Sequence, residues 1–144
     1  MNQNVYREYL AILREEIVPA LGCTEPIAIA YAAAKARSVL GRLPEHIDVR
    51  CSGNIIKNVK SVTVPNTGGL KGIQAAVAAG VVAGDENAAL EVIHAVTPEK
   101  RREIARFLSE VPITVEPMDN CALLDMIVTV YAGAHEASVR ISHS

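Results

Sequence analysis

The sequence predicts a single α/β (α+β) sandwich domain in which a mixed sheet packs against helices. Half of the 144 residues are apolar, which is enough for one sizeable core. A chain of this length is too short to need two domains. Segments with helical spacing of apolar residues alternate with segments of strand-like alternation. The last third holds three strand-like segments, whose connections are too short for crossover helices, so we expect them to run antiparallel.

Two helices and a strand are expected first. Apolar residues recur at helical spacing over residues 5–18, and Pro19 ends this segment. Thr24 can cap a second helix, which we expect over residues 24–40. Residues 46–51 alternate between apolar and polar side chains, which predicts a half-buried strand.

The elements expected after this strand are less regular. Residues 54–60 fit either a short helix or an irregular turn. The further elements are a strand at residues 62–64, a loop at 66–69, helices at 70–82 and 86–96, a helix opened by Thr97 and Pro98 with Ile104, Phe107 and Leu108 as its apolar stripe, and strands at 111–115, 123–132 and 137–141.

Composition narrows the class of function. The formal net charge is -2 and acids and bases are well mixed, so no basic stripe is present to bind nucleic acid or anionic lipid. No apolar run reaches the roughly 18 residues that span a bilayer, and the first 14 residues are amphipathic rather than signal-like. We therefore expect a cytoplasmic protein with small-molecule chemistry and neither a nucleic-acid nor a membrane partner.

The cysteines and histidines give no metal-site pattern. Cys23, Cys51 and Cys121 are odd in number, widely spaced and form no C-x-x-C pair. The four histidines include no H-x-x-x-H pair. Both observations argue against a disulfide framework and a self-contained zinc site, so we expect reduced thiols and assign no metal ligand.

The segment Gly-Cys-Thr-Glu-Pro at residues 22–26 lies where one predicted helix ends and the next begins. Free backbone N–H groups and the helix dipole at such a junction stabilise a thiolate, which makes Cys23 a candidate base. Each residue also has a structural explanation as a helix cap, a helix starter or a small buried side chain. Helix-cap signatures far outnumber catalytic thiols, so spacing alone favours the capping interpretation.

Two further segments combine polar side chains with turns. Residues 52–58, Ser-Gly-Asn-Ile-Ile-Lys-Asn, suit an amino-acid carboxylate, although Lys57 and Asn58 are equally well explained as solvated loop residues. Residues 65–72, Pro-Asn-Thr-Gly-Gly-Leu-Lys-Gly, give the order strand, Gly-rich loop and helix that builds an anion site. The dinucleotide fingerprint needs Gly where Thr67 stands, and a P-loop needs Ser or Thr after Lys71, so we interpret this segment as a carboxylate or phosphate cradle.

Taken in order, residues 20–28, 52–58 and 65–72 resemble the successive motifs of the iron-sulfur L-cysteine desulfidases, the family also catalogued as UPF0597. The resemblance covers essentially the whole chain. It implies that residues 1–144 are one domain, the N-terminal fragment of a longer enzyme. It further implies a C-terminal helical iron-sulfur domain, similar to the catalytic domain of bacterial iron-sulfur L-serine dehydratases, which we expect to lie outside these 144 residues. The fold would then resemble the β domain of those dehydratases.

The resemblance implies a lyase reaction that converts L-cysteine and water to pyruvate, ammonia and hydrogen sulfide. A [4Fe-4S] cluster would act as Lewis acid on the leaving sulfur, and its cysteine ligands belong to the absent region. The family's proposed base matches Cys23, and Glu25 is assigned to the catalytic site with it. The expected substrate-binding residues are Thr24, Asn54, Lys57, Asn58, Asn66, Thr67 and Gly68.

A rival interpretation is an amino-acid-binding or regulatory domain that contributes no catalytic group. Under the lyase interpretation the expected partners are a small amino acid and the protein's own C-terminal domain. The surface that normally meets that domain would favour a homodimer when uncovered. This chain alone is expected to be inactive, and L-cysteine and L-serine both stay open as substrates.

Overall fold

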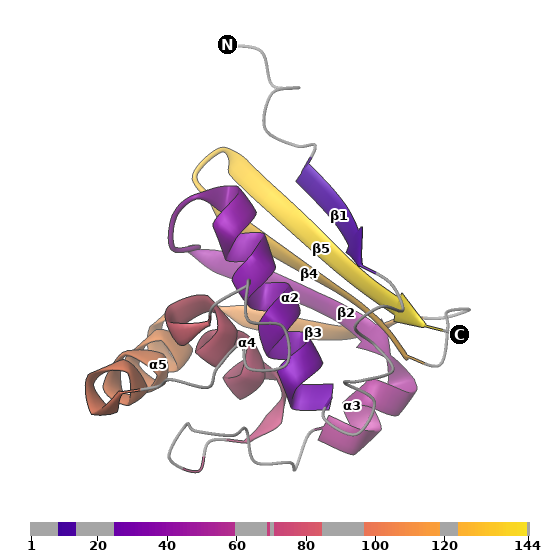
Figure 1. The fold of residues 1–144 in the computed structure, drawn as a ribbon, viewed down its shortest axis with the longest axis horizontal. Helices are drawn as coiled ribbons and strands as arrows, with labels where there is room; N and C mark the ends of the chain where they lie inside the picture. The colour runs from indigo at the N-terminus through magenta and orange to yellow at the C-terminus, as the bar shows by residue number, and fades with distance from the viewer. Residues whose placement is uncertain are drawn as a thin grey trace.

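The computed structural model describes residues 9–13, 25–59, 69, 71–84, 97–118 and 124–143 (Figure 1). Helices and strands alternate over the first part of the chain, and strands close it. In chain order the elements are β1 (Tyr9–Leu13), α2 (Glu25–Leu40), β2 (His46–Ser52), α3 (Gly53–Val59), α4 (Gly72–Ala83), α5 (Pro98–Glu110), β3 (Ile113–Met118), β4 (Leu124–Ala132) and β5 (His135–His143).

The five strands form one mixed sheet in the order β1-β5-β4-β2-β3. β4 is antiparallel to both of its neighbours, β2 and β5. β1 is parallel to β5, and β3 is parallel to β2. α2 lies across one face of the sheet and α4 packs beside it (Figure 1). The predicted class, a mixed sheet packed with helices, is confirmed.

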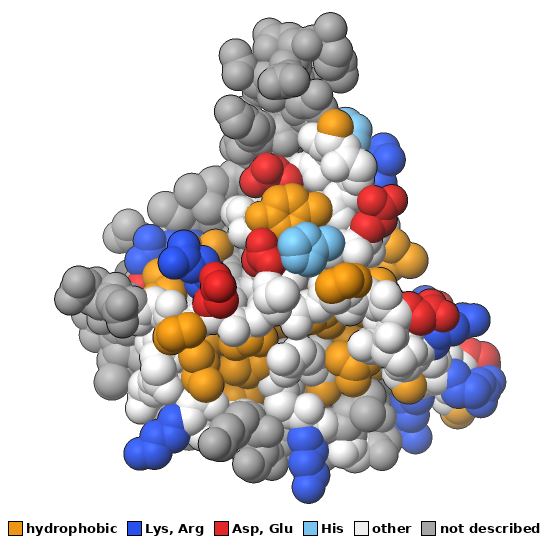
Figure 2. Space-filling model, turned by 180° about the vertical axis from the view of Figure 1, so that it is seen from behind, with side chains coloured by type: hydrophobic (Ala, Val, Ile, Leu, Met, Phe, Trp, Pro, Cys, Tyr) orange, Lys and Arg blue, Asp and Glu red, His pale blue; other side chains and the backbone are white. Residues whose placement is uncertain are grey.

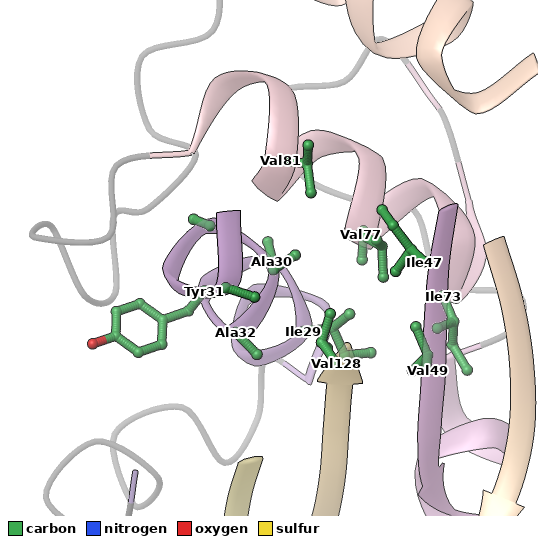
Figure 3. Close-up of a cluster of buried hydrophobic side chains, with 14 of the residues drawn as sticks. Ile29, Ala30, Tyr31, Ala32, Ile47, Val49, Ile73, Val77, Val81 and Val128 are labelled. Atoms are coloured by element: carbon green, nitrogen blue, oxygen red, sulfur yellow. The ribbon is translucent and has the colours of Figure 1, made fainter. Parts of the chain in front are cut away.

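The core lies between this sheet face and the helices. Ile47 and Val49 of β2 and Val128 of β4 are buried at alternate strand positions and meet Ile29 of α2 and Val77 of α4 (Figure 3). The alternation of residues 46–51 predicted this burial, because successive strand side chains point to opposite faces. Tyr31 also lies on α2, but its ring points away from this cluster (Figure 3).

Small residues let α2 and α4 run parallel in close contact. A Cβ atom at Gly80 would lie 2.1 Å from the carbonyl oxygen of Ala30, and one at Gly84 would lie 2.7 Å from the Cβ of Ala34. Only the missing side chains of these glycines allow that approach, and the alanine-rich sequence of α2 provides the matching surface. Because Ala30 faces Gly80 and Ala34 faces Gly84, the two helices begin at the same end of the domain.

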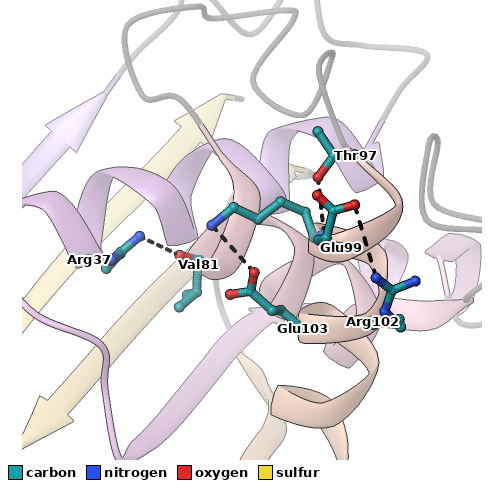
Figure 4. A network of polar contacts seen from close by, with 7 residues as sticks. Arg37, Val81, Thr97, Glu99, Arg102 and Glu103 are labelled. Carbon is teal, nitrogen blue, oxygen red and sulfur yellow. Dashed lines mark hydrogen bonds and ion pairs between the residues drawn. The ribbon is translucent and has the colours of Figure 1, made fainter.

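Hydrogen bonds fix the last turns of α2 and α4 and the first turn of α5 (Figure 4). The Arg37 guanidinium donates to the carbonyl oxygen of Val81 at 3.0 Å and so joins the last turns of α2 and α4. The backbone N–H of Gly41 donates to the Arg37 carbonyl, and the φ of Gly41 is 84°, which glycine adopts readily. The Thr97 hydroxyl accepts from the Lys100 N–H at 3.1 Å and caps α5, as the sequence predicts.

The predicted helix over residues 5–18 is wrong where the structure describes it, because Tyr9–Leu13 form β1. Their backbone pairs with β5 from Tyr9 opposite Ala137 to Leu13 opposite Ile141. Pairing with an exposed strand edge satisfies the backbone of this segment, and tertiary context of this kind overrides helical periodicity. Residues 5–8 and 14–18 of the prediction lie outside the described residues.

β3 differs from its prediction in position and neighbour. It spans Ile113–Met118 rather than residues 111–115, and among the described strands it occupies a sheet edge beside β2 instead of pairing with β4. β3 still runs antiparallel to β4, as predicted, because β2 is parallel to β3 and antiparallel to β4. Pro117, which has no N–H, lies opposite Cys51 in this edge pairing.

The other predicted elements are confirmed or lie outside the described residues. α2, β2, α4, α5, β4 and β5 overlap their predicted ranges, and the described part of the ambiguous segment at 54–60, residues 54–59, belongs to α3. The predicted strand at 62–64 and the helix at 86–96 lie outside the described residues, as do residues 66–68 of the loop. None of the helices described here is long and apolar enough to cross a membrane.

Candidate functional site

The three sequence motifs lead into helices that begin at one end of the domain. α2 begins at Glu25, α3 at Gly53 and α4 at Gly72, and all three starts lie at the lower end of the sheet in Figure 1. The parallel strands β2 and β3 end there too, with Ser52 opposite Met118. Ligands of α/β proteins commonly bind beyond the carboxyl ends of parallel strands. This end of the domain is therefore the candidate site.

Ser52 fixes the turn between β2 and α3. Its side chain is buried, and its hydroxyl oxygen accepts a hydrogen bond from the Ile55 N–H at 3.3 Å. The hydroxyl thus satisfies one of the free N–H groups at the start of the helix. The arrangement turns the chain directly from strand to helix and places Lys57 in the last turn of α3.

An open pocket of about 720 Å³ lies between α3, α4 and β3. Its described lining includes two cations, one amide and an apolar wall: Gly53, Ile56, Lys57, Lys71, Gly72, Ile73, Gln74, Val115 and Pro117. Seen from behind, hydrophobic side chains gather on the lower part of the molecule, and Lys or Arg side chains stand at its lower margin (Figure 2). The pocket joins the second and third motifs at the candidate site.

Of the predicted site residues, Lys57 lines the pocket and is exposed. Asn54 is exposed in the first turn of α3 and is not among the described pocket residues. Asn58 lies in α3 and Glu25 begins α2, but their side chains lie outside what the structure describes. Cys23, Thr24, Asn66, Thr67 and Gly68 also lie outside the described residues. Their assignments stay predictions.

Lys71 and Gln74 are pocket residues that the sequence analysis did not select. Lys71 precedes α4 in extended conformation, with φ -128°, and its side chain makes no capping hydrogen bond. The φ of Gly72 is 92°, a conformation that favours glycine. The sequence signal that could have indicated Lys71 is the Gly-Leu-Lys-Gly segment at residues 69–72, because a cation beside the start of a helix is a common anion-binding arrangement.

The described residues do not fit an iron-sulfur cluster. Among them no group of three or more His, Cys, Asp or Glu side chains is placed to hold a metal ion. Cys51 has its side chain buried in the core, on the inward face of β2. It therefore cannot present its sulfur to a cluster at the surface without unpacking β2 from the helices.

A second polar cluster lies on the outer face of the sheet and ties three strands together. His46 Nε2 lies 3.0 Å from Asp48 Oδ1 on β2, and the Thr114 hydroxyl of β3 donates to the same carboxylate. The Tyr131 ring of β4 stacks on His46, with centroids 5.1 Å apart and planes 18° apart.

The cluster shifts the ionisation of two of its members. Partial burial alone would raise the pKa of Asp48, but hydrogen bonds from Thr114 and Tyr131 and the charge of His46 lower it overall. Burial, followed by the nearby Asp48 carboxylate, raises the pKa of Tyr131 to about 12. The carboxylate is thus already occupied as a hydrogen-bond acceptor, and the cluster is best explained as a tie between strands.

Comparison with known proteins places the chain among its relatives. It is 51% identical over 137 residues to a UPF0597 protein of Desulfitobacterium hafniense, which covers 95% of this chain and 32% of the relative. It is 47% identical over 137 residues to a UPF0597 protein of Lachnoclostridium phytofermentans, covering 95% of this chain and 33% of the relative. The chain is a relative of the UPF0597 proteins.

The chain spans about a third of the length of these UPF0597 relatives. The UPF0597 protein of Treponema denticola shows the same relation, with 46% identity over 90% of this chain and 30% of the relative. No family model and no solved structure matches the chain. The expected likeness to the β domain of L-serine dehydratases therefore stays a prediction.

Proposed function

We propose that the chain is the N-terminal part of an L-cysteine desulfidase-like lyase that is active only together with the rest of a longer protein. The reaction converts L-cysteine and water to pyruvate, ammonia and hydrogen sulfide. One observation carries the proposal: the helices that follow the three motifs begin at one end of the sheet, beside a pocket that contains Lys57. The UPF0597 relationship supports it.

In this proposal the residues of the chain bind the substrate and move one proton. The Cys23 thiolate removes the α-proton of L-cysteine, and its place before α2 favours the thiolate through the helix dipole. The electron pair of the broken C–H bond forms the C=C bond, and sulfide leaves. Water then hydrolyses the resulting aminoacrylate to pyruvate and ammonia.

The other predicted residues hold the substrate during these steps. Lys57 pairs with the substrate carboxylate, and Thr24 and Glu25 shape the site around Cys23. The proposal assigns the [4Fe-4S] cluster to the rest of the longer protein. The described residues do not fit this cluster, so the roles proposed for this chain are substrate binding and proton transfer.

The first test is the anaerobic release of sulfide and pyruvate from L-cysteine. It compares this chain with the same sequence extended to the length of its relatives and carrying a reconstituted cluster. We expect both products from the extended protein and neither from the 144-residue chain. Release of sulfide by the 144-residue chain would contradict the division of the site.

Replacing the proposed base separates catalysis from binding. Cys23→Ser in the extended protein is expected to lower kcat by about 10²–10⁴-fold and to leave L-cysteine binding intact, because a general base contributes on that scale. Cys51→Ala is the matched control, since it removes a thiol that lies in the core and is expected to retain activity. Retained kcat in Cys23→Ser would argue against the lyase role of Cys23.

An amino-acid-binding or regulatory domain is the second candidate. The observation that favours it is the chemistry of the described pocket, where Lys57, Lys71 and Gln74 are groups that bind an anion or an amide. Such a domain would tolerate Cys23→Ser in the extended protein while losing ligand affinity when the pocket lysines are replaced. The Cys23→Ser variant distinguishes the candidates, because both of them expect weaker binding when Lys57 is replaced.

A further inference from the structure

We propose that Lys71 acts with Lys57 as a two-cation site for the carboxylate of a small organic ligand in the pocket between α3 and α4. That the ligand is an amino acid rests on the proposed lyase function. The two-cation site is inferred from the residues that line the pocket. Lys57 comes from the second motif and Lys71 from the third, so the fold joins two segments that the sequence separates.

Both lysines line one cavity. Each is exposed and lines the same 720 Å³ pocket. Three other cations of the described chain lie in ion pairs: Lys100 with Glu103, Arg102 with Glu99, and Arg140 with Asp125. Neither pocket lysine is in a salt bridge among the described residues. Charge-assisted hydrogen bonds from two ammonium groups to a carboxylate are stronger than bonds between neutral partners.

The backbone beside Lys71 adds to the positive potential. Gly72, Ile73 and Gln74 begin α4 and line the pocket, and no acidic residue stands in the first turn of this 12-residue helix. The positive φ of Gly72 sets the direction in which the chain enters the helix. The start of the helix alone is no site, but here it lies against the same cavity as the two lysines.

The remaining walls suit the carbon body of the ligand. Ile56 of α3 and Val115 of β3 are half-buried, and Ile73 of α4 is buried. Gln74 is exposed and can donate to or accept from a polar substituent. A ligand with a carboxylate at one end and a short apolar stem therefore matches the described lining better than an inorganic anion does.

The test compares three probes by titration calorimetry with the 144-residue chain. They are L-cysteine, 3-mercaptopropionate, which lacks the amino group, and cysteamine, which lacks the carboxylate. We expect the two carboxylates to bind and cysteamine to bind at least tenfold more weakly. Lys57→Gln and Lys71→Gln are each expected to weaken carboxylate binding by about tenfold to a hundredfold, the range for a hydrogen bond to a charged group.

Two variants serve as controls. Lys100→Gln removes a lysine that pairs with Glu103 and does not line this pocket, so it is expected to leave carboxylate binding unchanged. Lys71→Arg keeps the charge and is expected to bind within a few-fold of the native chain. Because both pocket lysines are exposed, their replacement is expected to leave the thermal unfolding midpoint within about 1–2 °C of the native value.

The outcomes separate this inference from the lyase proposal. Carboxylate binding that needs both lysines, together with no sulfide release by the extended protein, supports the two-cation site and contradicts the lyase. Sulfide release with an unchanged KM in Lys71→Gln overturns the site and leaves the lyase. Equal binding of cysteamine and L-cysteine, or no lysine-dependent binding of any probe, also overturns the site.

Discussion

Replacing Gly80 with alanine tests the close contact between α2 and α4. The added Cβ would lie 2.1 Å from the carbonyl oxygen of Ala30 and 2.8 Å from its carbonyl carbon and Cα. These are backbone atoms of a helix, so no side-chain rotation can relieve the overlap. Ordinary contacts between heavy atoms are about 3.5 Å or longer, so the helices must separate by roughly 1 Å.

The cost follows from what that separation does to the core. A gap of about 0.5–1 Å forfeits a quarter to a half of the dispersion energy of each contact across it. Overpacking a core by one methyl costs about 1–3 kcal/mol, and we expect the upper part of this range because the α2–α4 contact surface is buried along its length. Alanine regains about 1 kcal/mol through its helix propensity. The net loss in unfolding free energy is about 2 kcal/mol.

Urea and thermal unfolding followed by circular dichroism measure this loss. For a domain of this size, about 2 kcal/mol lowers the melting temperature by roughly 6 °C. Gly53→Ala is the matched control, because a Cβ there would meet no heavy atom within 4 Å and its φ is not in the left-handed region. We expect it to be neutral or slightly stabilising. A Gly80→Ala protein as stable as the control would refute the close packing of α2 on α4.

Three further predictions concern polar groups. Because the pKa of Tyr131 is raised to about 12, the contribution of Tyr131 to stability is complete below pH 10 and is lost as the pH rises toward 12. The tyrosinate absorbance of the native protein minus that of Tyr131→Phe should show this late titration, and a midpoint near pH 10 would contradict it. Arg140→Ala leaves the Asp125 carboxylate, 1% exposed, without its bidentate guanidinium partner and is expected to lower the free energy of unfolding in urea by about 3 kcal/mol. A loss below about 1 kcal/mol would contradict the bidentate pair. Thr97→Ala removes the cap of α5 and is expected to lower the free energy of unfolding by about 1 kcal/mol in urea. Thr97→Ser keeps a hydroxyl at this position and should retain most of the stability that the cap provides.

The helices and the central strands could be predicted because their signals are local. Thr97 and Pro98 mark the start of α5 whatever the rest of the chain does, and Gly41 marks the end of α2. The alternation in β2 likewise follows from one buried and one outer face of the sheet. Such features are set by neighbours within a few residues, so the sequence alone indicates them.

The sheet edges could not be predicted, because their partners are remote in sequence. Tyr9–Leu13 have apolar residues at a spacing that fits a helix, and only the open edge of β5 makes a strand of them. β3 similarly pairs with β2 across the intervening helices rather than with the next strand along the chain. Local periodicity carries no information about either pairing.

The candidate site was predicted in part. The second motif indicated Lys57, and the structure places it in the pocket. Lys71 belongs to the segment predicted to form a carboxylate or phosphate cradle but was not among the predicted site residues, and the structure places it at the same cavity. A motif test asks whether residues fit a known sequence pattern, whereas a pocket depends on which helix starts the topology brings together. The catalytic assignments of Cys23 and Glu25 stay predictions.

The edge position of β3 bears on how the protein behaves at high concentration. An edge strand offers unpaired backbone groups to which a strand of another molecule can add, and this is a common route to aggregation. β3 limits that route, because Pro117 lacks an N–H and Glu116 places an exposed charge beside it. Replacing both with valine would give the strand a continuous β-branched sequence, and light scattering during refolding should then rise with protein concentration.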